Sequence, residues 1–362
     1  MRSKSISRPK GDSLFKTRLQ KLQSLMKQNQ LDCCLIENPL DLYYFTGIRL
    51  SAGRLIATRK MMRLYVDGRY LQVAQETAPL SVALESKNSL LEFFKEHPIK
   101  TVAFDGGHTS YDRFKQLKSL CQKKSQLIPS SPFFKQLRVV KDKTEIAKMK
   151  KSAALLWKGF QWIISSLKKG IKEKEVAKGF EIFCLEKGAD SLSFDPIIAF
   201  GSNSAMPHYR SQNVALREGD IVLVDIGVVV DQYHSDMTRV LFYKKEDPVL
   251  SQLYQIVQRA QKQALALCRP GMKLGQLDVA AREVFRQEKV EDLFVHSLGH
   301  GIGLETHEFP RLKHDGEDKD LLLEQGMVFT VEPGLYLPGK GGVRYEDTIV
   351  ITSKGYENFY PN

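Results

Sequence analysis

The 362-residue sequence has few cysteines and no long hydrophobic stretch. Its five cysteines show no paired spacing, which argues against a disulfide framework and favours a reducing compartment. No apolar run approaches the ~20 residues that a membrane-spanning helix requires. The basic segment Met1–Ser7 also lacks the apolar core of a signal peptide. We therefore expect a soluble, cytoplasmic protein with no membrane partner.

The composition is that of a large globular protein with an excess of positive charge. Hydrophobic residues make up 42% of the chain, and a length of 362 residues is natural for two domains. The net charge of +12 is spread in short groups. No basic stripe is interleaved with aromatics and no nucleic-acid motif is present, so solvated helix faces explain the charge and a nucleic-acid partner is not expected.

Two aspartates stand close together in the second half of the chain. Asp225 interrupts the buried-strand pattern of residues 221–227, and the chain returns through residues 232–236 to Asp236. This pattern predicts a β-hairpin. With the turn centred near residues 230–231, Asp225 would lie directly opposite Asp236, with Cβ atoms about 5 Å apart. Such carboxylates repel each other unless cations lie between them; alternatively, one caps the turn and the other is solvated.

A histidine-rich segment follows at residues 296–308. It places His296, His300 and His307, three of the eight histidines, within twelve positions. Glycines at alternate positions disfavour a helix and allow the backbone to approach a ligand closely. A single histidine is often a hydrogen-bonded core residue, but neutral imidazoles gathered in this way indicate binding of a divalent transition metal.

Two further carboxylates lie in predicted strands near the carboxyl end. Glu332 follows the apolar run 328–331 and precedes a Pro-Gly breaker, and Glu346 lies in a predicted single strand over residues 341–351. Period two places Arg344 on the same face as Glu346 and Tyr345 on the other. Arg344 is expected either to orient a metal-bound carboxylate or substrate group or to form an ordinary cross-strand ion pair.

The candidate ligands are oxygen-rich: they are Asp225, Asp236, His300, Glu332 and Glu346. Four carboxylates and one imidazole suit Mn²⁺, Co²⁺ or Zn²⁺ in a shared site better than a structural zinc ion, which prefers cysteine. Two metal ions about 3.5–4 Å apart lower the pKa of the water between them and polarise a scissile carbonyl. The sequence therefore predicts a dinuclear hydrolase that uses a bridging hydroxide.

These motifs resemble those of the Xaa-Pro peptidases, aminopeptidase P and prolidase, in the pita-bread metallopeptidase family. The resemblance rests on the spaced aspartates, residues 296–308, Val331–Gly334 and Gly342–Asp347, and it covers essentially the whole chain. It implies a catalytic domain with a curved antiparallel sheet covered by helices. It also implies hydrolysis of the amino-terminal Xaa-Pro bond in peptides with proline at the second position, and a homodimer.

The resemblance further implies a role for each candidate residue. The five ligands would hold two divalent ions, with Mn²⁺ expected first and Co²⁺ or Zn²⁺ as alternatives, and Asp236 and Glu346 would bridge both ions. Glu332 would take and relay the proton of the attacking water. The remaining positions match residues that contact or orient the substrate: they are His208, His296, His307 and Arg344. His208 or His307 would stabilise the developing charge.

The amino-terminal third differs from the rest of the chain. Short apolar runs alternate there with helix-like stretches, which argues for an α/β domain with a mixed sheet. Segments Asn38–Gly47 and Val66–Tyr70 resemble the amino-terminal domain of creatinase- and prolidase-type enzymes. The composition changes near residues 130–143, where prolines are followed by a charged helix start, and this change marks the boundary between the two domains. We predict an α/β (α+β) protein with domains at 11–135 and 140–362, the second containing helices at 144–167, 173–187, 250–268 and 274–287.

Two other functions remain open from the sequence alone. The first is a catalytically inactive pita-bread module that binds an acidic partner through its basic surface, although such a descendant would be free to lose ligands and all five are present. The second is a creatinase-like reaction, which hydrolyses a guanidine-type carbon without metals. Retention of Asp236, His300 and Glu346 counts against that reaction. Dipeptide and longer Xaa-Pro substrates are not distinguished.

Overall fold

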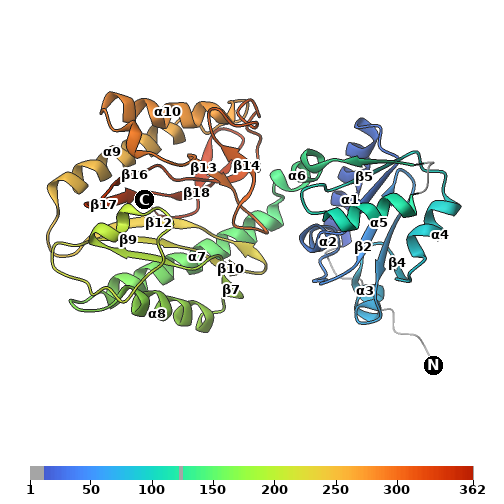
Figure 1. The fold of residues 1–362 in the computed structure, drawn as a ribbon, viewed down its shortest axis with the longest axis horizontal. Coiled ribbons are helices and arrows are strands. Elements are labelled where there is room, and N and C mark those ends of the chain that lie inside the picture. The colour runs from blue at the N-terminus through green and yellow to red at the C-terminus, as the bar shows by residue number, and fades with distance from the viewer. Residues whose placement is uncertain (1–11, 122–124, 362) are drawn as a thin grey trace. The chain divides into compact units, whose positions relative to one another are not determined.

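The computed structural model describes residues 12–121 and 125–361 (Figure 1). The chain divides into two compact units, Met1–Leu137 and Arg138–Asn362. Each unit has its own sheets and its own hydrophobic core. Within the described ranges, no helix combines the length and the apolar character needed to cross a membrane.

The first unit is built on a mixed six-stranded sheet with the order β4-β3-β2-β1-β5-β6. Strand β1 pairs antiparallel with β2 and parallel with β5, so the predicted mixed α/β architecture is confirmed. The elements of this unit are α1 (Asp12–Gln28), β1 (Cys33–Ile36), α2 (Pro39–Thr46), β2 (Arg54–Thr58), β3 (Met62–Val66), α3 (Leu71–Thr77), β4 (Ser81–Leu84), α4 (Ser89–Glu96), β5 (Thr101–Phe104), α5 (Tyr111–Leu120), β6 (Gln126–Pro129) and the start of α6 (Ser131–Val139).

The second unit contains antiparallel sheets and four long helices, as the pita-bread resemblance implied. Each of those helices lies within a few residues of its predicted range. The elements are α7 (Lys143–Ser166), α8 (Glu173–Glu186), β7 (Ser191–Leu192), β8 (Ile197–Phe200), η2 (Gly201–Ala205), β9 (Ile221–Ile226), β10 (Val228–Val230), β11 (Tyr233–His234), β12 (Met237–Phe242), α9 (Pro248–Leu265), α10 (Leu274–Gln287), η3 (Glu291–Leu293), β13 (Gly299–Gly301), β14 (Glu308–Leu312), β15 (Val328–Val331), β16 (Gly334–Leu337), β17 (Gly341–Arg344), β18 (Asp347–Ile351) and β19 (Tyr356–Asn358).

The strands of the second unit lie between two helical pairs, α7 with α8 and α9 with α10 (Figure 1). Strand β9 has both faces buried in consequence. Its residues Val222 and Val224 join the core under α7 and α8, whereas Ile221 and Leu223 join the core under α9 and α10. Because side chains alternate along a strand, Asp225 has the parity of Ile221 and Leu223. The strand therefore reads as a continuous apolar run with one carboxylate.

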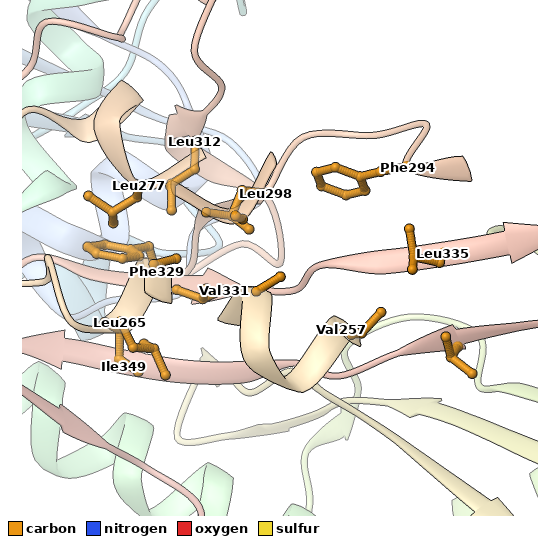
Figure 2. Close-up of a cluster of buried hydrophobic side chains, with 14 of the residues drawn as sticks. Val257, Leu265, Leu277, Phe294, Leu298, Leu312, Phe329, Val331, Leu335 and Ile349 are labelled. Atoms are coloured by element: carbon orange, nitrogen blue, oxygen red, sulfur yellow. The ribbon is translucent and has the colours of Figure 1, made fainter. Parts of the chain in front are cut away.

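The core under α9 and α10 holds together strands that are distant in sequence. Figure 2 shows Val257 and Leu265 of α9 among Val331, Leu335 and Ile349, which come from β15, β16 and β18. All of these side chains are buried. Close packing of these side chains fixes the ends of β15 and β18, next to which Glu332 and Glu346 lie. The apolar core therefore positions two carboxylates that are not part of it.

The predicted hairpin exists, but its predicted register is wrong. The turn is at Asp231 and Gln232, which both have positive φ (52° and 72°), and Val230 pairs with Tyr233. Asp225 therefore lies opposite Thr238, not opposite Asp236. The shift is two residues, so Asp225 keeps its parity. Asp236 lies between β11 and β12, outside both strands.

The predicted single strand over residues 341–351 is also corrected by the structure. It consists of two strands, β17 and β18, separated at Tyr345 and Glu346. Strand β17 pairs with β16, whereas β18 pairs with β15 and β19. The Glu346 amide bonds instead to the Thr238 carbonyl at 3.2 Å. Tyr345 packs against Tyr254 and Arg239, away from Glu346 as expected.

Gly299 permits the closest backbone approach near the site. A Cβ atom at this position would lie 2.0 Å from the Thr330 carbonyl oxygen, a backbone atom that cannot move aside. We expect Gly299→Ala to lower the free energy of unfolding by at least about 2 kcal/mol, as measured by chemical denaturation. Gly355→Ala is the matched control, because the nearest atom to its Cβ would be at 3.9 Å. Equal stability of the two variants would contradict the prediction.

Candidate metal centre

The five predicted ligands come from five separate segments of the second unit. Asp225 is on β9, Asp236 precedes β12, His300 is on β13, Glu332 follows β15 and Glu346 precedes β18. Ligand atoms of Asp236, His300 and Glu346 all lie within 4.8 Å of one another. The His300 Nε2 atom is 3.7 Å from Asp236 Oδ2 and 3.5 Å from Glu332 Oε1. The structure thus brings these four side chains together. Asp225 is connected to the cluster by Arg344, whose guanidinium donates a hydrogen bond to Asp225 Oδ2.

Burial of so many carboxylates perturbs their protonation. Burial, followed by the neighbouring Glu346 and Asp225, raises the pKa of Asp236 well above its usual value. Burial and Glu346 do the same to Glu332. Burial and then Asp225 raise the pKa of Glu346 to about 8. Without additional positive charge, these carboxyl groups stay protonated to a higher pH than solvent-exposed Asp and Glu side chains do.

Two buried carboxylate oxygens lack the partners that such atoms normally have. Asp225 Oδ1 and Asp236 Oδ1 accept no hydrogen bond from any described residue. A buried acceptor of this kind is costly, because it has lost its hydration and gained nothing in return. Divalent cations would satisfy both oxygens and would also relieve the repulsion between the acids. The residues present therefore fit a metal centre.

His300 is prepared as a neutral ligand. Burial, followed by the nearby His307, lowers its pKa to about 3, so the imidazole is uncharged at neutral pH. Its Nδ1 atom is 3.1 Å from the Gly301 carbonyl oxygen, a contact that assigns the proton to Nδ1. The Nε2 lone pair then faces Asp236 and Glu332, and a backbone acceptor behind a histidine ligand is common in metal sites.

Arg344 ties the acidic residues together. Its guanidinium donates to Asp225 Oδ2, to Thr238 Oγ1 at 3.1 Å and to the Tyr336 hydroxyl at 2.5 Å. Thr238 Oγ1 in turn donates to Glu346 Oε2 at 2.7 Å. Arg344 is 3% exposed, so these charge-assisted bonds are shielded from water. Arg344 therefore fixes the orientation of Asp225 directly and of Glu346 through Thr238.

The three remaining predicted histidines differ in their surroundings. His296 Nε2 is 2.9 Å from the Tyr336 hydroxyl, which links it to Arg344, and burial followed by Arg344 lowers its pKa to about 3. His307 keeps an exposed face, with its ring centre 4.2 Å from that of His300. Partial burial and then the charge of His208 lower the pKa of His307. His208 itself is exposed.

Several supporting residues were missed by the sequence analysis. Arg239 donates to the Glu346 carbonyl at 2.6 Å and to Asp347 Oδ1 at 2.6 Å. Gln261 of α9 donates to the other Asp347 oxygen at 3.0 Å. Thr238 and Arg239 are polar residues inside an apolar strand, which was a usable signal. For Gln261 the sequence contains no comparable signal, because its partners lie 70 and 86 positions away along the chain. Nothing in the local pattern around Tyr336 indicates that it bonds to His296 and Arg344.

Comparison with known proteins agrees with this geometry. Residues 147–353 match the model of metallopeptidase family M24, and residues 18–140 match the creatinase/prolidase N-terminal domain. The chain belongs to metallopeptidase family M24. It is 35% identical over 345 residues to the Xaa-Pro dipeptidase of Pyrococcus furiosus, an alignment that covers 94% of this chain and 97% of that protein.

Solved structures in the family have the same fold. Prolidase from Pyrococcus furiosus superimposes with a TM-score of 0.85 at 33% identity, covering 94% of this chain and 99% of that one. The Xaa-Pro dipeptidase from Bacillus anthracis gives 0.88 at 31% identity, with 96% and 98% covered. X-Pro aminopeptidase from Thermotoga maritima gives 0.84 at 31% identity, with 94% and 98% covered. The predicted family and fold class are confirmed.

The raised carboxyl pKa values predict an unusual pH dependence for the metal-free protein. Between the unfolded pKa of about 4 and the folded pKa of about 8, the folded state holds more protons than the unfolded state. The free energy of unfolding should therefore fall as pH rises through this range. Thermal unfolding in a chelator should show the fall, and added Mn²⁺ should abolish it. The Asp236→Asn variant should lose less stability with pH and gain less from the metal; a wild-type curve independent of pH and metal would contradict the prediction.

Thr238→Val tests the connection between Arg344 and Glu346. The substitution keeps the side-chain shape but removes the hydroxyl that bonds to both residues. We expect metal affinity, measured by calorimetry, to fall about 10- to 100-fold, because the carboxylate loses its orientation. Thr144→Val on the exposed start of α7 is the control and should bind metal as the wild type does. Unchanged affinity in Thr238→Val would show that Glu346 does not need this support.

Proposed function

We propose that this protein hydrolyses the amino-terminal Xaa-Pro bond of short peptides with two divalent metal ions. The observation that carries the proposal is the cluster formed by the partly buried Glu332 and the buried Asp225, Asp236, His300 and Glu346, with two carboxylate oxygens that have no partner among the described residues. The names of the relatives, an Xaa-Pro dipeptidase and an X-Pro aminopeptidase, indicate the peptide bond concerned.

The five clustered side chains would hold the metal ions. Bound divalent ions would supply a nucleophilic water at neutral pH and polarise the scissile carbonyl. We infer Mn²⁺ first, with Co²⁺ or Zn²⁺ as alternatives, because carboxylate oxygens dominate the ligand set. Arg344 would hold Asp225 in the orientation that the metal requires.

Other residues would handle protons and charge. Glu332, which lies 3.5 Å from His300 Nε2, would accept the proton of the attacking water at its carboxylate and pass it to the leaving proline nitrogen. His208 or His307 would stabilise the charge that develops on the carbonyl oxygen. His296 would orient the substrate through the bond network that it shares with Tyr336 and Arg344. The proline nitrogen carries no N–H, so recognition would rely on the free amine and the ring.

A catalytically inactive binding module is the less favoured alternative. A protein that only binds a partner has no use for a buried group of mutually repelling acids, since that group destabilises the fold without a cation. We also propose a homodimer and a cytoplasmic location. The second is supported by five cysteines that are all free, as is usual in a reducing compartment.

The decisive test is hydrolysis by the chelated protein after Mn²⁺, Co²⁺ or Zn²⁺ is restored. We expect alanine release from Ala-Pro, from Ala-Pro-Ala or from both, and no release of methionine from Met-Ala-Ser. The ratio of kcat/KM for the two proline peptides separates a dipeptidase from an aminopeptidase. Asp236→Ala should lose activity by at least about 10³-fold, whereas Asp292→Ala, on the exposed face of η3, should keep it. No release with any metal would reject the proposal.

A further inference from the structure

Glu173 is a buried carboxylate without a cationic partner. It is the first residue of α8 and is 0% exposed. No lysine or arginine in the described part of the chain forms an ion pair with it. Burying an unpaired charge costs several kcal/mol unless hydrogen bonds replace the lost water. Hydrogen bonds from nearby residues must therefore offset the cost of burying the Glu173 carboxylate, and the identity of these residues indicates its role.

All four hydrogen bonds to this carboxylate come from residues 200–212, which run from the last residue of β8 through η2 and are called the 200–212 loop below. Oε1 accepts from the Phe200 amide at 2.8 Å and from Asn203 Nδ2 at 2.9 Å. Oε2 accepts from the Tyr209 hydroxyl at 2.7 Å and from the Gln212 amide at 2.8 Å. Both oxygens thus have two donors each, and the four donors span residues 200–212. His208 lies inside that span.

The bonds reach the immediate neighbour of His208. Asn203 Nδ2 also donates to the Tyr209 hydroxyl at 2.8 Å, so Glu173, Asn203 and Tyr209 form a closed triangle. Burial and the bond to Glu173 raise the pKa of Tyr209, which keeps its hydroxyl proton available for donation. These bonds hold the side chain of the residue that directly follows His208 in the chain.

The other side of the loop is attached to the strand that carries Arg344. Ser204 Oγ accepts from the Gly342 amide at 2.8 Å and donates to the Gly201 carbonyl at 2.7 Å. A Cβ atom at Gly342 would lie 2.3 Å from the Ser204 carbonyl oxygen, so β17 and the loop are in direct contact. The loop is therefore held between α8 and β17, and His208 lies in the chain between Ser204 and Tyr209, which make these attachments.

We propose that Glu173 is a positioning residue that holds the 200–212 loop so that His208 faces the metal centre; this rests on the proposed function. A buried carboxylate suits the task because it accepts four bonds at fixed angles, and a neutral amide accepts fewer. The charge also lies at the start of α8, where the helix dipole favours it. The cost of burying the Glu173 charge is offset only when all four donors of the loop are in place. This requirement favours the native conformation of the loop.

Glu173→Gln tests the role, because the amide keeps the shape but turns two acceptor sites into donors that face the Tyr209 hydroxyl and the Gln212 amide. We expect kcat/KM for the preferred proline peptide to fall about 10- to 100-fold. Tyr209→Phe, which removes a single bond, should lose about 2- to 10-fold. Glu175→Gln is the matched control: it is exposed in the same helical turn, bonds only to the Lys172 amide and should keep wild-type activity.

A double-mutant cycle separates positioning from general stability. In a His208→Ala background, Glu173→Gln should lower kcat/KM by less than about 2-fold further, because the residue that it positions is gone. Metal affinity should be unchanged in Glu173→Gln, since no hydrogen bond or ion pair in the described part of the chain joins Glu173 to any of the five ligands. Losses that multiply fully in the double variant would overturn the inference while leaving the proposed function intact.

Hydrogen exchange gives a readout that does not need activity. The amides of Phe200 and Gln212 should lose protection in Glu173→Gln and keep it in Glu175→Gln. If the wild type hydrolyses no proline peptide, the proposed function fails, and the exchange result alone decides whether Glu173 holds the loop. Unchanged protection in Glu173→Gln would overturn the inference in either case.

Discussion

Repulsion among buried carboxylates is the constraint on which the rest of the catalytic unit depends. Asp225, Asp236, Glu332 and Glu346 are brought together where little water can screen them, and the pKa values of the last three are raised as a result. Such a group persists only if the surrounding fold is stable enough to hold it in place. The neutral His300 adds no charge, and Arg344 offsets only part of the repulsion. Divalent cations would offset the remaining repulsion, so the arrangement of acids that lowers stability without metal also fits a metal centre.

The scaffold meets this constraint by placing each acid at a point that packing has already fixed. Asp225 lies on a strand with apolar cores on both faces, and Glu332 follows a strand buried under α9. Glu346 lies in the break between β17 and β18, where Thr238 and Arg239 bond its side chain and its carbonyl. Asp347 next to it is paired with Arg239 and Gln261. Hydrogen bonds from rigid strands thus set the orientation of the acids.

The sequence was a good guide to elements and a weaker guide to register. The long helices were predicted closely because their apolar periodicity is strong. Helix α2 was not predicted, although Asn38 caps it and Gly47 ends it with a φ of 72°. The hairpin register failed because Asp231 and Gln232 adopt positive φ without glycine. Strand parity survived the error, since the shift was by two residues.

The sequence by itself determined the family, the fold class and the identity of the candidate ligands, because these depend on residue types and on motifs that are local in the chain. Only the tertiary structure decided how the ligands are oriented and which residues support them. Thr238 bonds to Glu346, 108 positions away, Tyr336 bonds to His296, 40 positions away, and Glu173 bonds to residues 27 to 39 positions away. Such contacts arise when strands and helices pack, so the sequence does not show which residues they join. Short motifs in the sequence supply the candidate ligands, and packing between distant segments sets their geometry.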